Sequence, residues 1–212
     1  GIADVAHDLD ATGFGSVFTA VRDSALQFLS RFDRVVVWMK DDGAIRKACE
    51  AAGVPDIRVF PGLPPEDWHR HASEYYAECL GMANLPPLRL PFESDEAPHD
   101  ALIHPGSGGR RKNWPLERFG SLAAALTSEG RRVEWVVGPA EQELHLPGDF
   151  HVLALPGLVT LARHLSVTGL YVGNDRGVTH LAAACGCPTV AVFGPTHPAV
   201  WAPRGENVTV VS

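Results

Sequence analysis

Residues 170–193 read LYVGNDRGVTHLAAACGCPTVAVF, and this stretch indicates the class of fold. Its first residues, 170–173, form an apolar run that is typical of a short buried strand. The small-residue segment 176–185 predicts a helix, which Gly186 ends. A second apolar run at 189–193 completes a strand–helix–strand unit. Because such a unit joins parallel strands, the stretch predicts an α/β fold with a parallel sheet.

The rest of the second half repeats this alternation of apolar runs and helical patterns. Six strands are predicted, at 101–104, 132–137, 151–155, 170–173, 189–193 and 208–211. The predicted helices span 115–128, 158–167 and 176–185. Six strands with intervening helices are typical of a doubly wound, Rossmann-like domain, whose ligand lies beyond the carboxyl ends of the strands.

The first half shows the same alternation over a shorter length. The patterns predict helices at 19–31, 42–52 and 65–81, and strands at 34–39 and 57–60. Residues 84–98 then change character, because four prolines fall among acidic and polar residues. This composition is typical of a linker. We therefore expect two domains, a partial α/β domain with its linker over 1–98 and a ligand-binding domain over 99–212.

The charge and the cysteines exclude several classes of function. Residues 1–98 hold 16 acidic and nine basic residues and so carry the whole net charge of −7. Nucleic-acid binding, which needs a basic footprint, is not expected. No apolar run approaches the roughly 18 residues that cross a bilayer, so membrane contact is expected to be peripheral at most. Four cysteines without a Cys-x-x-Cys pair predict no zinc site and suit a reducing cytoplasm.

The first segment that carries chemistry is HPGSGGRRKNWP, residues 104–115. Three glycines and a basic cluster follow a predicted strand, and Pro115 opens a predicted helix. Glycines let backbone amides approach an anion closely, and a helix start adds positive dipole. The Lys112 ammonium beside such a loop suits a diphosphate. The alternatives are a mobile loop and a solvated basic face, and the segment matches neither a Walker A loop nor GxGxxG.

The second segment, GNDRGVTH at 173–180, joins a predicted strand to a predicted helix. Asp175 is suited either to capping that helix or to accepting hydrogen bonds from sugar hydroxyls. The first amides of the helix, at Arg176 and Gly177, are suited to holding a phosphate. A lone histidine such as His180 serves either as a structural residue or as a ligand contact.

Two further strand ends point to the same edge of the sheet. Glu141 follows the predicted strand 132–137, where an acidic residue is suited to accept the ribose hydroxyls of a nucleotide or to answer a helix dipole. Residues 193–201, FGPTHPAVW, form a turn with an apolar tail after another strand. Four loops with glycines, hydroxyls or charges at one edge predict a binding site there.

Two of these blocks resemble the ADP-heptose:lipopolysaccharide heptosyltransferase family. HPGSGGRRKNWPLERFGSLAAAL is similar to the family's HPG loop with its following K-x-W-P and helix, and GNDRGVTHLAAACGCPTVAVFGPTHPAVWAP is similar to its D-[ST]-G-x-x-H and FGPT-D-P segments. The resemblance implies a GT-B-like fold of two Rossmann-like domains, the first incomplete here, in a chain truncated at both ends. It implies metal-independent, inverting transfer of a heptose or related sugar from an ADP-sugar to a lipopolysaccharide inner-core acceptor, in the cytoplasm or at the cytoplasmic face of the inner membrane.

The resemblance also implies roles for individual residues. Lys112 and Asp175 are expected to contact the donor and stabilise the transition state. The expected donor-binding residues are Ser107, Gly108, Lys112, Glu141, Asp175, Arg176, Gly177 and His180. Two positions depart from the family pattern, because Arg176 replaces a small hydroxyl residue and His197 stands where an aspartate is usual. No cofactor or metal is expected, since the ADP-sugar is a substrate.

The catalytic base is not assigned to any residue of this sequence. The family's amino-terminal strand and Gly-Asp loop do not appear, so the base is expected upstream of Gly1. Asp4 does not lie in that context, and the Asp-Leu-Asp of residues 8–10 is discounted as a metal motif because no strand is predicted before it. A non-catalytic nucleotide-sugar-binding module, or an inactive family member, is the main alternative. A sugar-nucleotide epimerase is a third, although no convincing carboxylate pair supports it.

Overall fold

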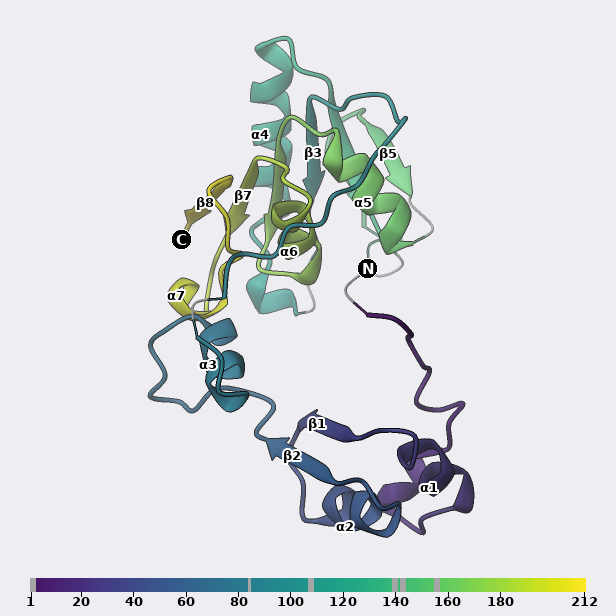
Figure 1. Ribbon diagram of the computed structural model, residues 1–212. Helices are drawn as coiled ribbons and strands as arrows, with labels where there is room; N and C mark the ends of the chain where they lie inside the picture. Colours follow the sequence, from purple (N-terminus) through teal and green to yellow (C-terminus); the bar gives the residue numbers. More distant parts are fainter. Residues whose placement is uncertain (1–2, 84, 107–108, 139–140, 142–143, 155–156) are drawn as a thin grey trace. The chain divides into compact units, whose positions relative to one another are not determined.

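The computed structural model describes residues 3–83, 85–106, 109–138, 141, 144–154 and 157–212. Within these ranges the chain is an α/β protein whose strands form two parallel sheets (Figure 1). It comprises two compact units, residues 1–68 and residues 69–212. Among the described residues, no helix has both the length and the apolar character that a membrane crossing requires. The α/β class predicted from the sequence is confirmed.

The first unit is a small strand–helix–strand arrangement. A 3₁₀ helix and α1 precede β1, and α2 crosses from β1 to β2, which pair in parallel. Apolar side chains from the helices and from the loop before β2 form its core. The elements are η1 (Phe14–Phe18), α1 (Asp23–Leu29), β1 (Arg34–Trp38), α2 (Ala44–Ala51) and β2 (Asp56–Phe60).

The second unit contains a six-stranded sheet in which every neighbouring pair is parallel. The spatial order of its strands is β5-β4-β3-β6-β7-β8. The strands are β3 (Ala101–His104), β4 (Val133–Val137), β5 (His151–Ala154), β6 (Tyr171–Asn174), β7 (Thr189–Val192) and β8 (Val208–Val211). The helices are α3 (Ala72–Cys79), α4 (Leu116–Ser128), α5 (Leu158–Ser166), α6 (Gly177–Ala184) and α7 (Pro198–Trp201).

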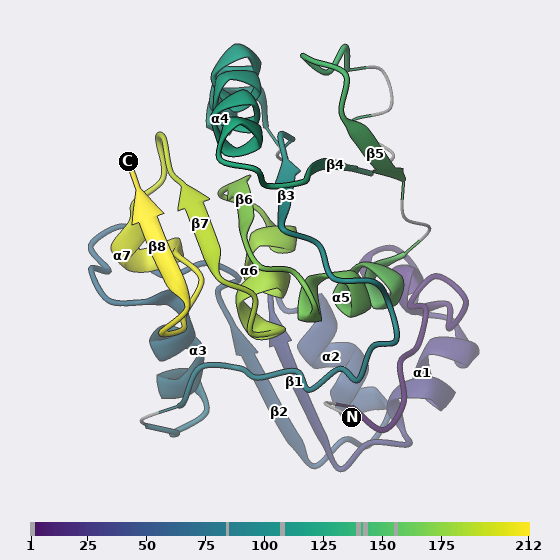
Figure 2. The same cartoon turned by 90° about the horizontal axis from the view of Figure 1, so that it is seen from above.

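Helices cover both faces of this sheet, as the near-continuous apolar strands require. Ile103 and Trp135 pack with Phe119 of α4 on one face. Leu102 packs with Leu165 of α5, and Ala182 of α6 lies in the same cluster, on the other face. Figure 2 shows α4 on one side of the strands and α5 and α6 on the opposite side. The central strands of the sheet are therefore the middle of three layers, whereas most residues of the outer strands β5 and β8 are exposed.

The strand order places a topological switch point between β3 and β6. Counted from β3, the order is 3-2-1-4-5-6, the Rossmann arrangement. The chain leaves β3 toward β4 on one side and later returns to add β6 on the other. The loops after these two strands begin at Pro105 and Asp175 in adjacent positions, and in a Rossmann arrangement the ligand is expected in a crevice between such loops at the carboxyl edge. Both blocks that carry the sequence motifs begin there.

Three predicted elements differ in the structure. The helix predicted over 19–31 is limited to α1, because Arg22 has an extended backbone and Val21 is exposed. The helix predicted over 65–81 is limited to α3, since the residues after Pro65 turn back rather than continue and His71 caps the helix by accepting from the Ser73 amide. The turn predicted after β7 contains the short helix α7.

Residues 69–98, which the sequence analysis assigns to the first domain and its linker, belong to the second compact unit. His71 Nε2 is 2.8 Å from the carbonyl oxygen of Ala202, and Arg204 donates to Ser73 Oγ at 3.0 Å. These contacts tie the start of α3 to the segment after α7. The compact units thus divide at Trp68, whereas the domain boundary at 98 stays a prediction.

Candidate functional site

The glycine loop after β3 is fastened to the end of β6 by one side chain. Asn174, the last residue of β6, is completely buried. Its Nδ2 donates to the Pro105 carbonyl at 2.7 Å, and its Oδ1 accepts from the Trp114 amide at 2.9 Å. The two ends of the loop are therefore held by a single amide, whose donor and acceptor are both used.

Asp175 is the acidic centre of the switch point. Its Oδ2 accepts from Lys112 Nζ at 2.7 Å and from Thr196 Oγ1 at 2.7 Å. The Asp175 side chain is 8% exposed, whereas that of Lys112 is 37% exposed. The carboxylate is thus sheltered, and the ammonium above it still reaches solvent. Loops after β3, β6 and β7 each contribute one member of this cluster.

The helix that follows Asp175 begins with amides that have no intrahelical partner and no side-chain cap. Arg176 is the N-cap of α6, with an extended backbone and no side-chain cap bond. The amides of Thr179 and His180 bond to the Arg176 carbonyl, as in a regular helix. The amides of the first turn have no intrahelical partner and lie at the positive end of the helix dipole, so this end favours an anion. Asp175 therefore does not serve as the helix cap, one of the two roles that the sequence left open.

A second charged cluster lies beside the first. The Arg176 guanidinium donates through Nη1 to Glu141 Oε1, and the Gly138 amide donates to Glu141 Oε2 at 2.9 Å. His104 Nε2 lies 3.5 Å from Arg176 Nη1 and 3.6 Å from Glu141 Oε2. The side chains of His104 and Glu141 are both 2% exposed, and that of Arg176 is 23% exposed. The cluster joins the carboxyl ends of three adjacent strands, β4, β3 and β6.

Burial and the Arg176 guanidinium decide the charges in this cluster. Burial lowers the pKa of His104 to about 4, and Arg176 acts in the same direction. Burial, the largest single effect, would raise the pKa of Glu141, but the hydrogen bonds from Arg176 and the Gly138 amide, together with the neighbouring charges, hold that pKa below its usual value. At neutral pH the cluster therefore consists of a neutral imidazole beside a guanidinium–carboxylate ion pair.

Gly106 lies directly against the Glu141 carboxylate. A Cβ atom at Gly106 would overlap that carboxylate, well inside van der Waals contact. A side chain at this residue would therefore displace the Glu141 carboxylate from its present position. The glycine loop and Glu141 are therefore fitted to each other.

The structure places most, though not all, of the predicted site residues at this edge. Lys112 is brought to Asp175, Arg176 is brought to Glu141, and Gly177 opens α6. His180 is exposed on α6 and lines a separate pocket of about 570 Å³. Ser107 and Gly108 lie outside the described residues. The ligand contacts assigned to all of these residues stay predictions.

Three residues of the site were not singled out from the sequence. Asn174 immediately precedes Asp175, and a polar residue that ends an otherwise apolar strand is the available signal. Thr196 lies in the turn predicted to line this edge, but its bond to Asp175 joins residues 21 positions apart. His104 ends β3 and is buried, with no bond at Nδ1 among the described residues. Long-range pairing of this kind leaves no local pattern.

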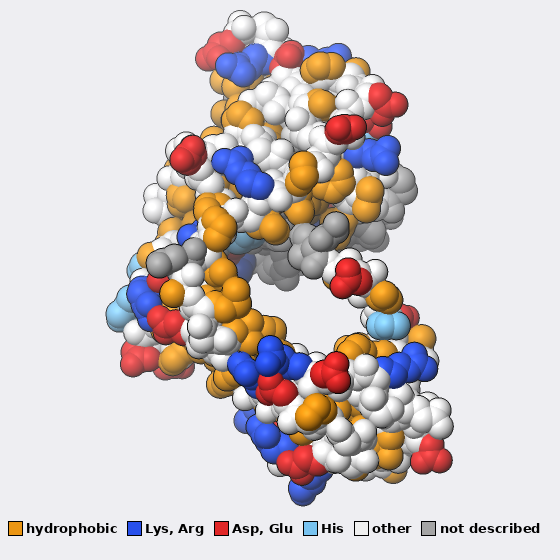
Figure 3. Space-filling model, in the orientation of Figure 1, with side chains coloured by type: hydrophobic (Ala, Val, Ile, Leu, Met, Phe, Trp, Pro, Cys, Tyr) orange, Lys and Arg blue, Asp and Glu red, His pale blue; other side chains and the backbone are white. Residues whose placement is uncertain are grey.

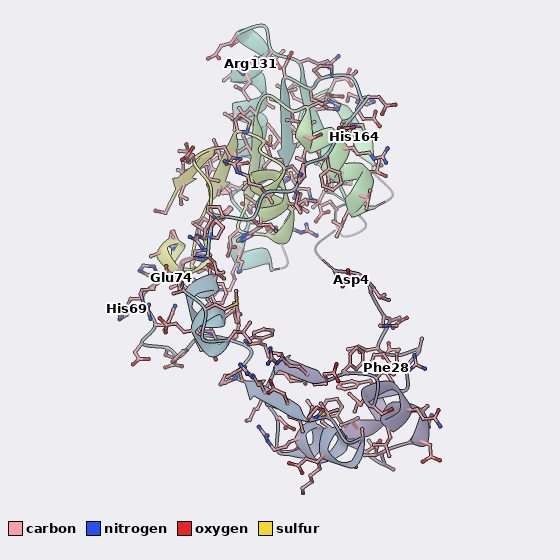
Figure 4. The ribbon with its side chains drawn as sticks, viewed as in Figure 1. Asp4, Phe28, His69, Glu74, Arg131 and His164 are labelled. Atoms are coloured by element: carbon pink, nitrogen blue, oxygen red, sulfur yellow. The ribbon has the colours of Figure 1, made fainter. Side chains whose placement is uncertain are left out.

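The Asp-Leu-Asp of residues 8–10 has a local role. Asp8 Oδ1 accepts from the Asp10 amide at 3.0 Å, which forms a turn. Asp4 lies on an extended stretch at the start of the described chain (Figure 4). No strand precedes residues 8–10 within the described part, as the sequence predicted. Within the described ranges, no three His, Cys, Asp or Glu side chains come together in a way that could hold a metal ion.

Comparisons with known proteins place the chain in a family and a fold. Lipopolysaccharide heptosyltransferase 1 of Escherichia coli (strain K12) is 32% identical over 105 residues, covering 47% of this chain and 33% of that protein. The structure of the E. coli ADP-heptose LPS heptosyltransferase II has a TM-score of 0.70 at 22% identity, covering 88% of this chain and 71% of that one. The structure of the iron-containing dodecameric glycosyltransferase TibC from enterotoxigenic E. coli has a TM-score of 0.60 at 19% identity, covering 76% of this chain and 48% of that one.

The structural likenesses, both under 25% identity, show a shared fold. The chain spans about a third of the length of this curated relative. The sequence profile of glycosyltransferase family 9 (heptosyltransferase) matches residues 68–212, well over half of the chain and all of the six-stranded sheet. The chain therefore belongs to glycosyltransferase family 9, the heptosyltransferase family.

Proposed function

We propose that the chain binds an ADP-sugar at the switch point of its six-stranded sheet and serves the transfer of heptose, or a related sugar, to a lipopolysaccharide core acceptor. The observation that carries the proposal is the cluster of Lys112, Asp175 and Thr196 between β3 and β6. It places an exposed ammonium, a sheltered carboxylate and the free amides of α6 within one crevice. The ammonium and the helix amides are suited to a diphosphate, and the carboxylate is suited to sugar hydroxyls.

The proposed reaction is a direct displacement with inversion. The acceptor oxygen forms a bond to the anomeric carbon on one side while the bond to the diphosphate oxygen breaks on the other. Negative charge grows on the departing ADP, and Lys112 and the first amides of α6 stabilise it there. The acceptor proton passes to a general base. That base is not assigned to any of the described residues.

We infer that this stabilisation needs no metal ion. Lys112 and Arg176 supply two cations at the crevice, and the positive end of α6 adds to them. Together they offset the charge that a divalent ion offsets in metal-dependent transferases. Ser107 and Gly108, in the same glycine loop, are proposed to add backbone or hydroxyl contacts to the diphosphate. The proposed location is the cytoplasm, at the cytoplasmic face of the inner membrane where an inner-core acceptor is reached.

Donor selectivity tests the proposal. Calorimetric titrations with ADP-heptose, UDP-glucose and GDP-mannose should show that ADP-heptose binds most tightly. Lys112→Ala should weaken both ADP and ADP-heptose by about tenfold or more, because it removes a charged hydrogen bond worth roughly 1.5–3 kcal/mol. Lys47→Ala, on the exposed side of α2, is the matched control and should leave both affinities unchanged.

Two outcomes decide between the candidate functions. Tightest binding of UDP-glucose or GDP-mannose, or no effect of Lys112→Ala, would contradict the ADP-sugar site. A transfer assay with a truncated lipopolysaccharide acceptor then separates an enzyme from a binding module. Heptose transfer with inverted configuration supports the proposed reaction, whereas tight donor binding without transfer supports the non-catalytic alternative.

A further inference from the structure

The side chain of Arg176 extends along the carboxyl edge of the sheet, where the nucleotide is proposed to bind. Its backbone caps α6 after β6, yet its guanidinium reaches Glu141, which follows β4, and passes His104 at the end of β3. These three strands are neighbours in the order β4-β3-β6. One side chain therefore spans the edge on which a nucleotide is expected to lie in a Rossmann arrangement.

The partner of Arg176 occupies the position that ordinarily reads the ribose. In a Rossmann fold, an acidic residue beyond the second strand accepts the ribose hydroxyls. Here β4 is the second strand of the domain, and Glu141 follows it. Its two carboxylate oxygens already accept from Arg176 and from the Gly138 amide, and Gly106 lies against it. At 2% exposure, the carboxylate presents almost no surface to a ligand.

The ion pair is expected to persist when a nucleotide binds. Separating it would leave a buried carboxylate without a cation, and a neutral ribose hydroxyl replaces a guanidinium poorly. His104 cannot take over, because burial keeps its imidazole neutral at pH 7. Arg176 meanwhile retains further N–H donors on a side chain that is 23% exposed. The residue that carries these donors is the N-cap of α6, where the diphosphate is proposed to bind.

We propose that Arg176 is a specificity-determining residue of the donor site, which withdraws Glu141 from the ribose so that the site recognises the diphosphate and not the ribose hydroxyls. The inference rests on the proposed ADP-sugar site. The family pattern has a small hydroxyl residue at this position. According to the inference, its replacement by arginine changes which part of the nucleotide the site recognises. A chain with a short side chain at this position would leave the glutamate free.

Ribose discrimination tests the inference directly. The affinities of ADP, 2′-deoxy-ADP and 3′-deoxy-ADP are measured by calorimetry for the native chain and for two variants. The native chain should bind all three within about threefold. Arg176→Ser should free Glu141 and raise the preference for ADP to about tenfold or more, since a charged hydrogen bond to a hydroxyl is then gained. Adding Glu141→Gln to Arg176→Ser should remove most of that preference.

The native chain alone can overturn the inference. A tenfold or larger preference for ADP in the native chain would show that Glu141 reads the ribose despite its ion pair. A ratio that stays near one in Arg176→Ser would show that Arg176 does not determine it. If Arg176→Ser does not fold, Arg176→Gln takes its place, since it keeps the length and the hydrogen-bonding groups without the charge. Lys112→Ala is the control, because it should weaken all three ligands equally.

Failure of the underlying site would look different. If neither the native chain nor any variant binds any of the three nucleotides, the proposed nucleotide site is wrong, and this inference is wrong with it. Failure of the inference alone, by contrast, appears as an unexpected ratio between the affinities of ligands that do bind. The two failures therefore cannot be confused.

Discussion

At the scale of single residues, the Asp175 carboxylate does not cap α6, although aspartate is common before a helix, and is therefore available to contact a ligand. Its carboxylate bonds Lys112 and Thr196, and its own amide donates to the Val192 carbonyl at 3.0 Å. The helix after it is left without a side-chain cap. The carboxylate is thus held over the crevice by bonds from loops far apart in the sequence, in a position suited to a sugar.

Replacing Asp175 should separate the sugar from the diphosphate. Asp175→Asn keeps the shape of the side chain but removes its charge and releases Lys112 for the phosphates. ADP affinity should therefore stay within about threefold, whereas ADP-heptose should weaken by about tenfold or more, because charged hydrogen bonds to sugar hydroxyls are lost. Titration of both ligands measures the split. Equal losses for the two ligands would contradict a sugar contact, and the exposed Asp149→Asn is the control.

His104 should make the fold sensitive to mild acid. Its pKa of about 4 in the folded chain lies below the ordinary value of 6.5. The unfolded chain therefore binds more protons between these values, and the free energy of unfolding falls as the pH drops from about 6.5 to about 4. His104→Gln, which does not titrate, should flatten this part of the profile. Urea unfolding at a series of pH values measures it, and an unchanged slope in the variant would be contrary to this account.

At the scale of elements, Asn174 links the end of β6 to the loop that carries Lys112. Because its amide bonds Pro105 and Trp114, the loop is held at both ends against β6. Thr179 Oγ1 also donates to the Asn174 carbonyl at 2.6 Å, which ties α6 to the same point. The strand, the loop and the helix therefore meet at one buried residue, which positions Lys112 without touching the proposed ligand.

Removing this link should affect both stability and donor binding. Asn174→Ala leaves buried backbone groups at Pro105 and Trp114 unpaired, and each such loss costs roughly 1–3 kcal/mol. ADP affinity should also fall, and Lys112→Ala should cost less in the Asn174→Ala background than in the native chain, because Lys112 is no longer held in place. Thermal unfolding and titration of the four proteins measure both effects. Additive losses in affinity would show that Asn174 is structural only.

Another buried polar network lies away from the site. His99 Nδ1 is 2.5 Å from Glu134 Oε2, and His99 Nε2 is 2.9 Å from Nδ1 of His164 on α5 (Figure 4). His99 precedes β3, and Glu134 is near the start of β4. These contacts fix α5 against the amino-terminal edge of the sheet, opposite the edge that carries the crevice.

The sequence predicted the strands of the sheet well and the side-chain pairs poorly. The run 101–104 is apolar and fully buried, and its predicted bounds match β3 to the residue. The run 208–211 also matches β8 to the residue, although most of that strand is exposed, so its β-branched residues are the signal there. The helix predicted over 65–81 was too long because Pro65 suits the first turn of a helix, whereas here the residues after it form a turn and the helix begins only after His71. The pairing of Arg176 with Glu141, 35 positions apart, depends on the strand order and could not be derived from local pattern.

At the scale of the whole molecule, the two units differ in what they contribute. Residues 69–212 form a sheet with the Rossmann order and hold every described residue of the candidate site. Residues 1–68 form a two-stranded unit, which we propose belongs to the acceptor side. On the face shown in Figure 3, basic and acidic side chains are interspersed rather than gathered into one patch. This face therefore lacks the basic footprint that a nucleic acid needs.

Backbone-amide NMR of the ¹⁵N-labelled 212-residue chain, titrated with ADP in the presence of EDTA, tests the central claim most directly. The account predicts that the largest shifts fall on Gly106, Lys112, Asp175, Arg176 and Gly177, with β1, β2 and the region of His99 unchanged. It also predicts that adding Mg²⁺ after removal of EDTA leaves the affinity within about threefold, since Lys112, Arg176 and the start of α6 supply the positive charge. Shifts centred elsewhere, or binding that appears only with Mg²⁺, would contradict a metal-independent nucleotide site at the β3–β6 switch point.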